Sequence, residues 1–238
     1  MWFAVDSVGA ECEVAAEHLL MGYQRAGSEW RRGYPSDAPH LERSWENFTG
    51  CIELVLRQAA RLEPIPWRDA LRELCQRTGG SGEAGAGAGD RPVRWWLTGS
   101  AALAVRGAPI EPGDLDLVCD SADAVALGEL LSDALIEPVV PSSADWLSKW
   151  WGRAFCGARI EWVGGVKADV DEPLPCDFGP QAARRLETVR FEDWEIEVPP
   201  LDLQRAVNQR RGLSDRVAMI DALSIAGIPE CPNHRRHL

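Results

Sequence analysis

Residues 93–119 contain the feature that most constrains the fold of this chain. Two short apolar runs, VRWWLT (93–98) and DLDLVC (114–119), are suited to buried strands, and a helix-sized segment lies between them. Thirteen residues separate Ser100 from Asp114, which is enough for two helical turns over AALAVRG and a return loop rich in Pro and Gly. The spacing predicts a strand, a helix and a second strand in close succession.

The second apolar run carries two acidic residues, Asp114 and Asp116, on either side of one leucine. Side chains two residues apart in a strand point to the same face of a sheet, so both carboxylates would share one face. Two like charges at this separation repel, and a hard divalent cation such as Mg²⁺ suits carboxylate oxygens. The alternative is an edge strand whose acids face solvent and need no metal.

Gly99 and Ser100 end the first apolar run and begin the predicted helix. Unpaired backbone N–H groups and the helix dipole at such a position favour an anion such as a phosphate, and glycine allows a close approach. We therefore expect a phosphate-binding turn beside the pair of carboxylates.

Composition and periodicity divide the chain into four segments. Residues 1–78 are expected to form a helical N-terminal region, 79–90 a Gly/Ala-rich linker, 91–228 the main domain and 229–238 a tail. Apolar residues at three- and four-residue spacing predict helices over 8–27, 38–62, 66–77, 120–135, 144–151, 200–211 and 214–225. Alternation predicts a strand over 158–166 and a hairpin with its turn near Glu192-Asp193.

The charge of the chain restricts its partners. The formal net charge is −12 and the isoelectric point is near 4.8, so the average surface repels polyanions. Broad binding to nucleic acid or to an anionic membrane is therefore disfavoured, and a small substrate, or a short contact with one RNA end, fits better.

Cysteine usage and the N-terminal sequence point to the cytoplasm. Seven cysteines are scattered without a CxxC motif or a metal-ligand spacing, which reduced thiols explain most simply. The first residues do not resemble a secretion signal, and no apolar stretch is long enough to span a membrane. We expect a cytoplasmic protein without a membrane partner.

Gly-Ser, a short helix and then Asp-Leu-Asp-Leu, over residues 97–118, resemble the nucleotidyltransferase superfamily of DNA polymerase β-like folds. The variant is similar to small bacterial members related to antibiotic nucleotidyltransferases and to abortive-infection-type nucleotidyltransferase toxins. The resemblance extends over roughly residues 93–220 and leaves the N-terminal third without a counterpart. It implies an α/β (α+β) fold, with a small mixed β-sheet flanked by helices, for the nucleotidyltransferase-like domain 91–228.

The resemblance also implies a third metal-binding carboxylate on a neighbouring strand. Glu161, in the alternating segment RIEWV, is the best match, and Asp169 and Asp171 are its rivals further along the chain. The alternative for Glu161 is an exposed strand position paired with an arginine such as Arg159, which would contribute little energy.

A segment near the C-terminus, QRRGLSDRVAMI (209–220), resembles one that follows the catalytic sheet in related enzymes. The resemblance assigns nucleotide binding to Arg210 or Arg211 and to Asp215, since an arginine can hold a triphosphate by paired hydrogen bonds. The alternative is a helix-capping aspartate beside solvated arginines. A lysine often found slightly earlier in the relatives has no equivalent here.

The implied reaction transfers a nucleoside monophosphate from an NTP to an acceptor hydroxyl or phosphate and releases pyrophosphate. Asp114 and Asp116 would bind two Mg²⁺ ions, Glu161 would hold a metal or act as a base, and Gly99 and Ser100 would hold phosphates. A small cationic antibiotic fits the acidic surface as acceptor, as in antibiotic resistance, and is preferred to a tRNA end. The tRNA end would suit a toxin of a toxin–antitoxin pair and would need basic residues such as Arg184, Arg185, Arg190 and Arg205 near the site. A different class is a non-catalytic nucleotide-binding or interaction domain that retains the fold.

Overall fold

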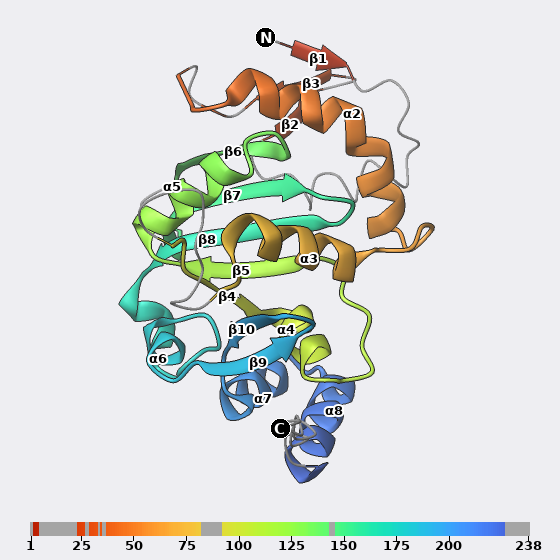
Figure 1. Ribbon diagram of the computed structural model, residues 1–238. Helices are drawn as coiled ribbons and strands as arrows, with labels where there is room; N and C mark the ends of the chain where they lie inside the picture. The colour runs from red at the N-terminus through yellow and green to blue at the C-terminus, as the bar shows by residue number, and fades with distance from the viewer. Residues whose placement is uncertain are drawn as a thin grey trace, which may run out of the picture.

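The computed structural model of the chain describes residues 2–4, 23–26, 29–32, 34, 37–81, 92–142 and 146–226. At its centre lies a five-stranded mixed sheet flanked by helices (Figure 1). In spatial order its strands are β4 (Trp95–Thr98), β5 (Leu115–Cys119), β8 (Arg159–Val166), β7 (Ser148–Phe155) and β6 (Leu135–Pro141). β5 and β8 are parallel and the other neighbours are antiparallel, which confirms the predicted mixed α+β class.

Helices and two smaller sheets surround this sheet. The helices are α2 (Leu41–Ala59), α3 (Trp67–Thr78), α4 (Gly99–Val105), α5 (Ser121–Leu130), the 3₁₀ turn η1 (Ala168–Asp171), α6 (Pro180–Ala183), α7 (Leu201–Arg210) and α8 (Ser214–Ala226). The smaller sheets are the hairpin β9 (Glu187–Phe191) with β10 (Trp194–Val198), and the antiparallel strands β1 (Trp2–Ala4), β3 (Glu29–Arg32) and β2 (Tyr23–Ala26). None of the helices in the described ranges is long and apolar enough to cross a membrane.

The hydrophobic core lies between one face of the central sheet and the helices that cover it. Leu97, Leu117 and Trp162 lie in register across β4, β5 and β8 and are buried. The Trp162 indole N–H donates to the Ala124 carbonyl of α5 at 3.1 Å, and the Trp95 indole, two residues before Leu97, donates to the hydroxyl of Thr78 at the end of α3 at 3.2 Å. Side chains alternate along a strand, so α3 and α5 cover this face and residues such as Asp116 point to the opposite one.

The segment before the linker shares this core. Leu71 and Leu74 of α3 are fully buried and cluster with Trp95 and Leu97 of the sheet. α2 packs along the edge strand β6, where the Asn47 amide donates to the Leu135 carbonyl at 2.9 Å. The helices α2 and α3 are therefore part of the same folded unit as the central sheet.

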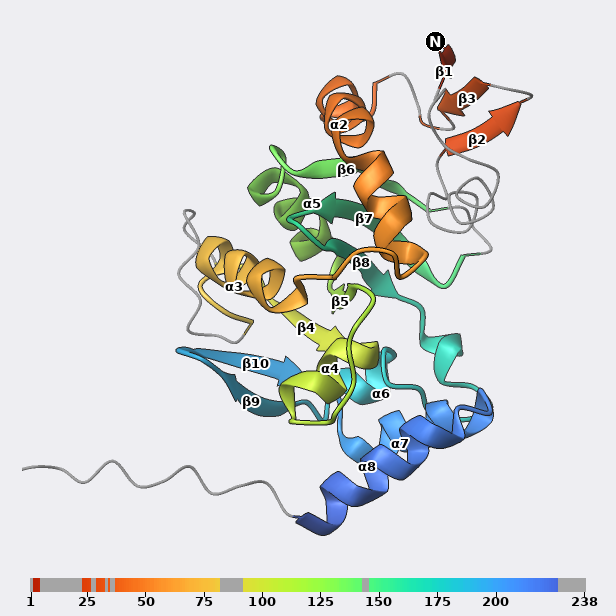
Figure 2. The same cartoon turned by 90° about the vertical axis from the view of Figure 1, so that its right-hand side faces the viewer.

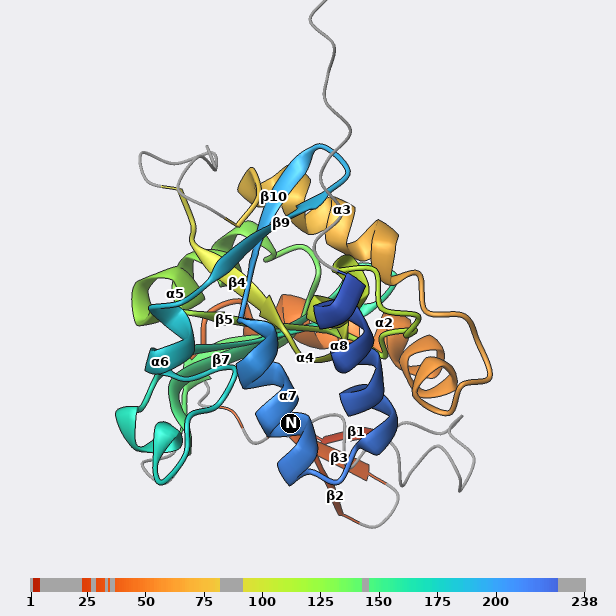
Figure 3. The same ribbon diagram turned by 90° about the horizontal axis from the view of Figure 1, so that it is seen from below.

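The C-terminal helices α7 and α8 pack against each other beside α4 (Figures 2 and 3). The buried Gln204 of α7 donates from its amide nitrogen to the Gly99 carbonyl at 3.3 Å, which joins α7 to the start of α4. This contact brings the C-terminal segment next to the Gly99-Ser100 turn.

Two of the predicted helices are wrong. The helix expected over 144–151 is largely the strand β7, in which Ser148–Phe155 pairs with β8; residues 143–145 lie outside the described ranges. The helix expected over 8–27 is wrong at Tyr23–Ala26, which forms β2, and residues 8–22 also lie outside those ranges. In both segments apolar side chains suit either structure, and pairing with a distant strand decides between them.

Candidate functional site

The three predicted carboxylates lie on the sheet face opposite α3 and α5. Asp116 in β5 is in register with Glu161 in β8 and with Thr98 in β4. Asp114 comes immediately before β5, two residues from Asp116 and therefore on the same side. The parallel pairing of β5 with β8 thus places acids from distant parts of the sequence next to one another.

Asp116 is the acid with the most unfavourable surroundings. No described residue donates a hydrogen bond to its carboxylate or forms an ion pair with it. Burial, followed by repulsion from Asp114 and Glu161, raises the pKa of Asp116 to about 8, while Arg159 acts in the opposite direction. A half-buried carboxylate beside two other acids is in an environment that a bound cation would make more favourable.

The backbone of Gly99 lies against this carboxylate. Gly99 has a positive φ of 63°, and a Cβ atom at this position would lie 2.6 Å from Oδ2 of Asp116. Only glycine satisfies both the left-handed backbone and the close approach. The Gly-Ser turn that the sequence singled out is therefore packed directly on the acid that it was expected to accompany.

Arginines engage the other two acids. Arg159 hydrogen-bonds Oδ2 of Asp114 through Nη2, and its Nε lies 2.6 Å from Oε1 of Glu161. Arg153 Nε lies 3.0 Å from the same Glu161 oxygen, and its Nη1 donates to Oε2 of Glu137 at 2.8 Å. We call these five residues, Glu137, Arg153, Glu161, Arg159 and Asp114, the charge row. It is deeply buried at one end, where Glu137 is 0% and Arg153 3% exposed.

The charge row means that the expected pairing of Glu161 with an arginine is present. This pairing leaves several carboxylate oxygens of the three acids without a hydrogen-bond donor. Within the described residues no donor bonds Oδ1 of Asp114, Oε2 of Glu161 or either oxygen of Asp116. These hard oxygens fit a divalent cation such as Mg²⁺. No group of three or more His, Cys, Asp or Glu side chains in the described residues is already arranged around one point, so Arg159 would have to yield to such an ion.

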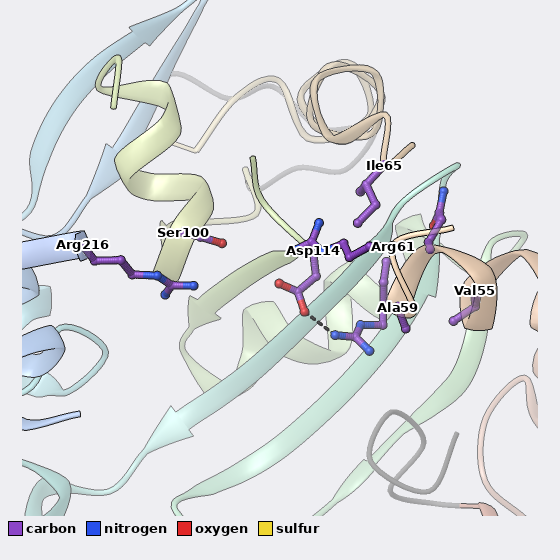
Figure 4. Close-up of a pocket in the computed structure, with 10 residues that line it drawn as sticks. Val55, Ala59, Arg61, Ile65, Ser100, Asp114 and Arg216 are labelled. Atoms are coloured by element: carbon purple, nitrogen blue, oxygen red, sulfur yellow. Dashed lines mark hydrogen bonds and ion pairs between the residues drawn. The ribbon is translucent and has the colours of Figure 1, made fainter. Parts of the chain in front are cut away.

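Two clefts open beside these acids. The acidic cleft, of about 370 Å³, contains Asp116, Glu161 and Gly99 together with an apolar wall; its lining is Thr98, Gly99, Asp116, Leu117, Val118, Leu147, Glu161, Trp162, Val163, Asp177, Phe178, Val207 and Arg211. The arginine cleft, of about 280 Å³, contains Asp114, Ser100 and three arginines (Figure 4); its lining is Val55, Gln58, Ala59, Arg61, Ile65, Ser100, Gly113, Asp114, Arg159 and Arg216. The consecutive residues Gly99 and Ser100 line one cleft each, so the two clefts flank this turn.

The predicted nucleotide-binding residues of the C-terminal segment separate in space. Arg211 lines the acidic cleft with Asp116. Arg210 instead donates from Nη2 to the Pro175 carbonyl at 2.7 Å. Asp215 is exposed and lines neither of the two clefts. Of these three, only Arg211 is next to the acids.

Asp169 and Asp171, the alternatives to Glu161 as the third carboxylate, line neither cleft. Asp169 is exposed in η1 and lines neither cleft. Asp171 is buried and accepts hydrogen bonds from the backbone N–H groups of Cys176 and Gln181, at 3.0 and 2.8 Å. Both oxygens of Asp171 thus fix the loop that leads from β8 to α6.

Asp177 is a further acid at the site that was not predicted from the sequence. It is buried in the acidic cleft, and burial raises its pKa. Its charge also contributes to the raised pKa of Asp116. Asp177 lies in a Pro-rich loop that has no periodic pattern. The sequence shows only that an acid follows the predicted strand 158–166, which does not predict where its side chain lies.

The arginines named for contact with tRNA largely have partners. Arg185 bonds Asp202 at 2.8 Å, Arg205 bonds Asp221 at 2.6 Å, and Arg190 donates to the Glu192 carbonyl at 2.9 Å. Arg184 is exposed. None of the four lines either cleft.

No protein-family model matches the chain, and no curated protein matches it. Among solved structures it is similar to the crystal structure of TM1012 from Thermotoga maritima, whose name describes it as a "putative nucleotidyltransferase". The similarity has a TM-score of 0.47 with 20% sequence identity, and it covers 66% of this chain and 92% of that one. A similarity at this level says nothing about the chemistry of the site, which depends on the residues described above.

Proposed function

We propose that the chain is a metal-dependent nucleotidyltransferase, which transfers a nucleoside monophosphate from an NTP to an acceptor and releases pyrophosphate. The observation that carries this proposal is the half-buried, unpartnered carboxylate of Asp116 beside Asp114 and Glu161, in a cleft that opens next to the Gly99-Ser100 turn. Unfavourable carboxylates gathered at a cleft indicate a functional site.

Each residue of the site has a part in this reaction. Asp114, Asp116 and Glu161 would hold the Mg²⁺ ions, whose charge neutralises the triphosphate and activates the attacking oxygen. Gly99 lets the phosphates approach the acids closely, and Arg211 can bond phosphate oxygens in the acidic cleft. Apolar side chains such as Phe178 and Val207 offer a surface for the base. The rate would come from positioning and from fixed charges.

The acceptor that fits best is a small cationic molecule such as an antibiotic. The net charge of −12 attracts cations, and most of the arginines named for tRNA contact are engaged by acids or carbonyl groups. Reduced thiols support a cytoplasmic site of action, since the five cysteines in the described ranges are unpaired.

One observation favours a second candidate, a non-catalytic nucleotide-binding domain. Arg159 already neutralises part of the charge on Asp114 and Glu161, so the fold can balance most of the site without metal. In that case the chain would bind a nucleotide without cleaving it.

The test is Mg²⁺-dependent release of pyrophosphate by the full chain. Each labelled NTP is incubated with a panel of cationic small molecules and, separately, with total tRNA, in Mg²⁺ and in EDTA. We expect labelled acceptor and pyrophosphate in Mg²⁺ only, with loss of both in Asp114→Asn and Asp116→Asn and no loss in Asp169→Asn, the exposed control. Equal turnover in Asp116→Asn would remove the catalytic assignment, and tight Mg·NTP binding without turnover would favour the second candidate.

A further inference from the structure

The arginine cleft contains two guanidinium groups with no partner in the described residues. Arg61 follows α2, and Arg216 lies in the first turn of α8. Neither side chain forms an ion pair or hydrogen bond with a described residue. Figure 4 shows Arg216 on one side of Asp114 and Arg61 on the other. In a chain of net charge −12, two uncommitted arginines that face one cleft favour an anionic ligand.

Ser100 adds a hydroxyl group to the same cleft. It is 7% exposed, and its hydroxyl has no hydrogen-bond partner among the described residues. Figure 4 shows the side chain directed into the cleft. The hydroxyl oxygen is reached from the cleft, so it can donate a hydrogen bond to a ligand oxygen there.

Arg61 is positioned by the end of α2. Its φ of 59° is that of the left-handed residue that closes a helix, since the Arg61 N–H donates to the Gln58 carbonyl at 3.0 Å and the Leu62 N–H donates to the Arg57 carbonyl at 2.8 Å. Its guanidinium rests against Gly113, where a Cβ atom would lie 3.2 Å from Nη2 of Arg61. The helix end and the glycine together place the charge of Arg61 next to Asp114.

The size of the arginine cleft limits the ligand. At about 280 Å³ it lies just below the range of roughly 300–1,000 Å³ typical of pockets that enclose a whole small molecule. A compact group with several anionic oxygens fits, and guanidinium groups bond phosphate oxygens in pairs. Ser100 lines the arginine cleft and its neighbour Gly99 lines the acidic cleft, so the two clefts flank the same turn.

We propose that the arginine cleft binds the distal phosphates of the nucleotide through Arg61, Arg216 and Ser100. The inference rests on the proposed function and extends it, because the residue after α2 lies outside the segment that resembles nucleotidyltransferases. The N-terminal helical region thereby takes part in substrate recognition rather than only covering the sheet.

The experiment measures binding of inorganic triphosphate to the full chain by calorimetry, in EDTA so that no metal site is involved. We expect Arg61→Gln and Arg216→Gln each to weaken binding roughly tenfold or more, as loss of a charge-assisted contact predicts, and Arg61→Lys to keep part of it. Arg43→Gln in α2 and Arg184→Gln, two exposed arginines outside both clefts, are the matched controls. Circular dichroism verifies that each variant is folded. Absence of triphosphate binding, or an equal loss in the controls, overturns the proposal.

Competition assays identify the source of the phosphates. ATP should displace triphosphate from the cleft, whereas AMP, which lacks the distal phosphates, should not. Displacement by a short single-stranded RNA but not by ATP would overturn the assignment to a nucleotide.

The outcome is separable from that of the proposed function. Asp116→Asn should keep triphosphate binding while it loses turnover. If the wild type turns over NTP but the two arginine variants bind triphosphate normally, this inference fails and the function stands. If binding depends on the two arginines but no NTP is turned over, the function fails and the site stands.

Discussion

Among single residues, Asp116 best illustrates how a site can work against the stability of the fold. Its carboxylate is half-buried on the sheet face opposite α3 and α5, where Asp114 and Glu161 repel it and no described group donates to it. Loss of hydration favours the protonated form, and the neighbouring charges add to that effect. Without a cation, the ionised group is destabilising, which is the usual compromise between activity and stability at a functional site.

Asp116→Asn should therefore stabilise the metal-free protein at alkaline pH. The pKa of Asp116 is raised to about 8 in the folded state, so the folded protein holds its proton more tightly than the unfolded chain does. This contribution to stability is complete below about pH 4 and is lost as the pH rises to about 8. We expect the variant to gain a few kcal/mol relative to wild type at pH 8 in EDTA and much less at pH 4. Thermal unfolding at both pH values tests this, and an equal shift at both would contradict it.

Gly99→Ala should affect the site more than the fold. The new Cβ would lie 2.6 Å from Oδ2 of Asp116 on a backbone with a φ of 63°, so either the acid or the turn must move. We expect a loss of turnover of at least about a hundredfold, since small displacements of reacting groups have effects of that size. Gly107→Ala is the control, because Gly107 also has a positive φ, of 92°, but a Cβ atom there would meet nothing within 4 Å. Similar losses in both variants would assign the effect to backbone strain alone.

At the scale of elements, the parallel pairing of β5 and β8 brings the acids of the candidate site together. The arginines of the charge row offset part of the negative charge of these acids. Arg159 comes from the first position of β8 and bridges acids from the two strands. Its guanidinium offsets repulsion that would otherwise oppose the pairing of these strands near Asp116.

Arg159→Gln should strengthen the binding of divalent cations. Removing one positive charge next to Asp114 and Glu161 leaves their oxygens to an added ion, and we expect roughly a tenfold or greater increase in Mn²⁺ affinity. Electron paramagnetic resonance of Mn²⁺ measures this without any turnover. Arg190→Gln, on the β9–β10 hairpin, should leave the affinity unchanged. An unchanged affinity in Arg159→Gln would mean that the arginine does not compete with metal.

Some of these elements could be predicted from the sequence and others could not, because local patterns do not encode contacts between distant segments. Local periodicity and turn residues define β5, β8 and the hairpin, and the same alternation placed Asp114 and Asp116 on one face. The position of Glu161 beside them was implied by the family resemblance and not by the alternation. β6 was not predicted because Pro138 and Pro141 argue against a strand, yet they are tolerated at the edge of a sheet. The helix predicted at β7 rested on tryptophans four residues apart, a spacing that does not encode the pairing with β8. Contacts such as Asp177 beside Asp116, or Arg61 beside Gly113, depend on distant segments and have no local signal.

At the scale of the whole molecule, the helices before the Gly/Ala-rich segment and the sheet after it form one core. Leu74 of α3 is fully buried with Trp95, and the indole of Trp95 donates to Thr78. The arginine cleft also draws on both sides of that segment, since α2, α4, α8 and β8 all contribute to it.

Leu74→Ala should consequently destabilise the central sheet as well as α3. Truncation of a buried leucine costs roughly 2–5 kcal/mol, and for a chain of this size that lowers Tm by about 5–15 °C. Near-ultraviolet circular dichroism, which reports the buried tryptophans, should show the same single transition as the far-ultraviolet signal. Leu62→Ala, at a position 61% exposed, is the control. A second, unshifted transition would indicate that the sheet folds without α3.

The charges of the charge row also predict how many divalent cations the site accepts. Its three carboxylates and two guanidinium groups leave one negative charge, and ionised Asp116 adds a second. A single doubly charged ion would bring this group to electrical neutrality. A second ion would need anions from outside the protein, and a triphosphate supplies them. For this group of residues we therefore expect the metal-free protein to accept one equivalent of divalent cation and the nucleotide to bring a second.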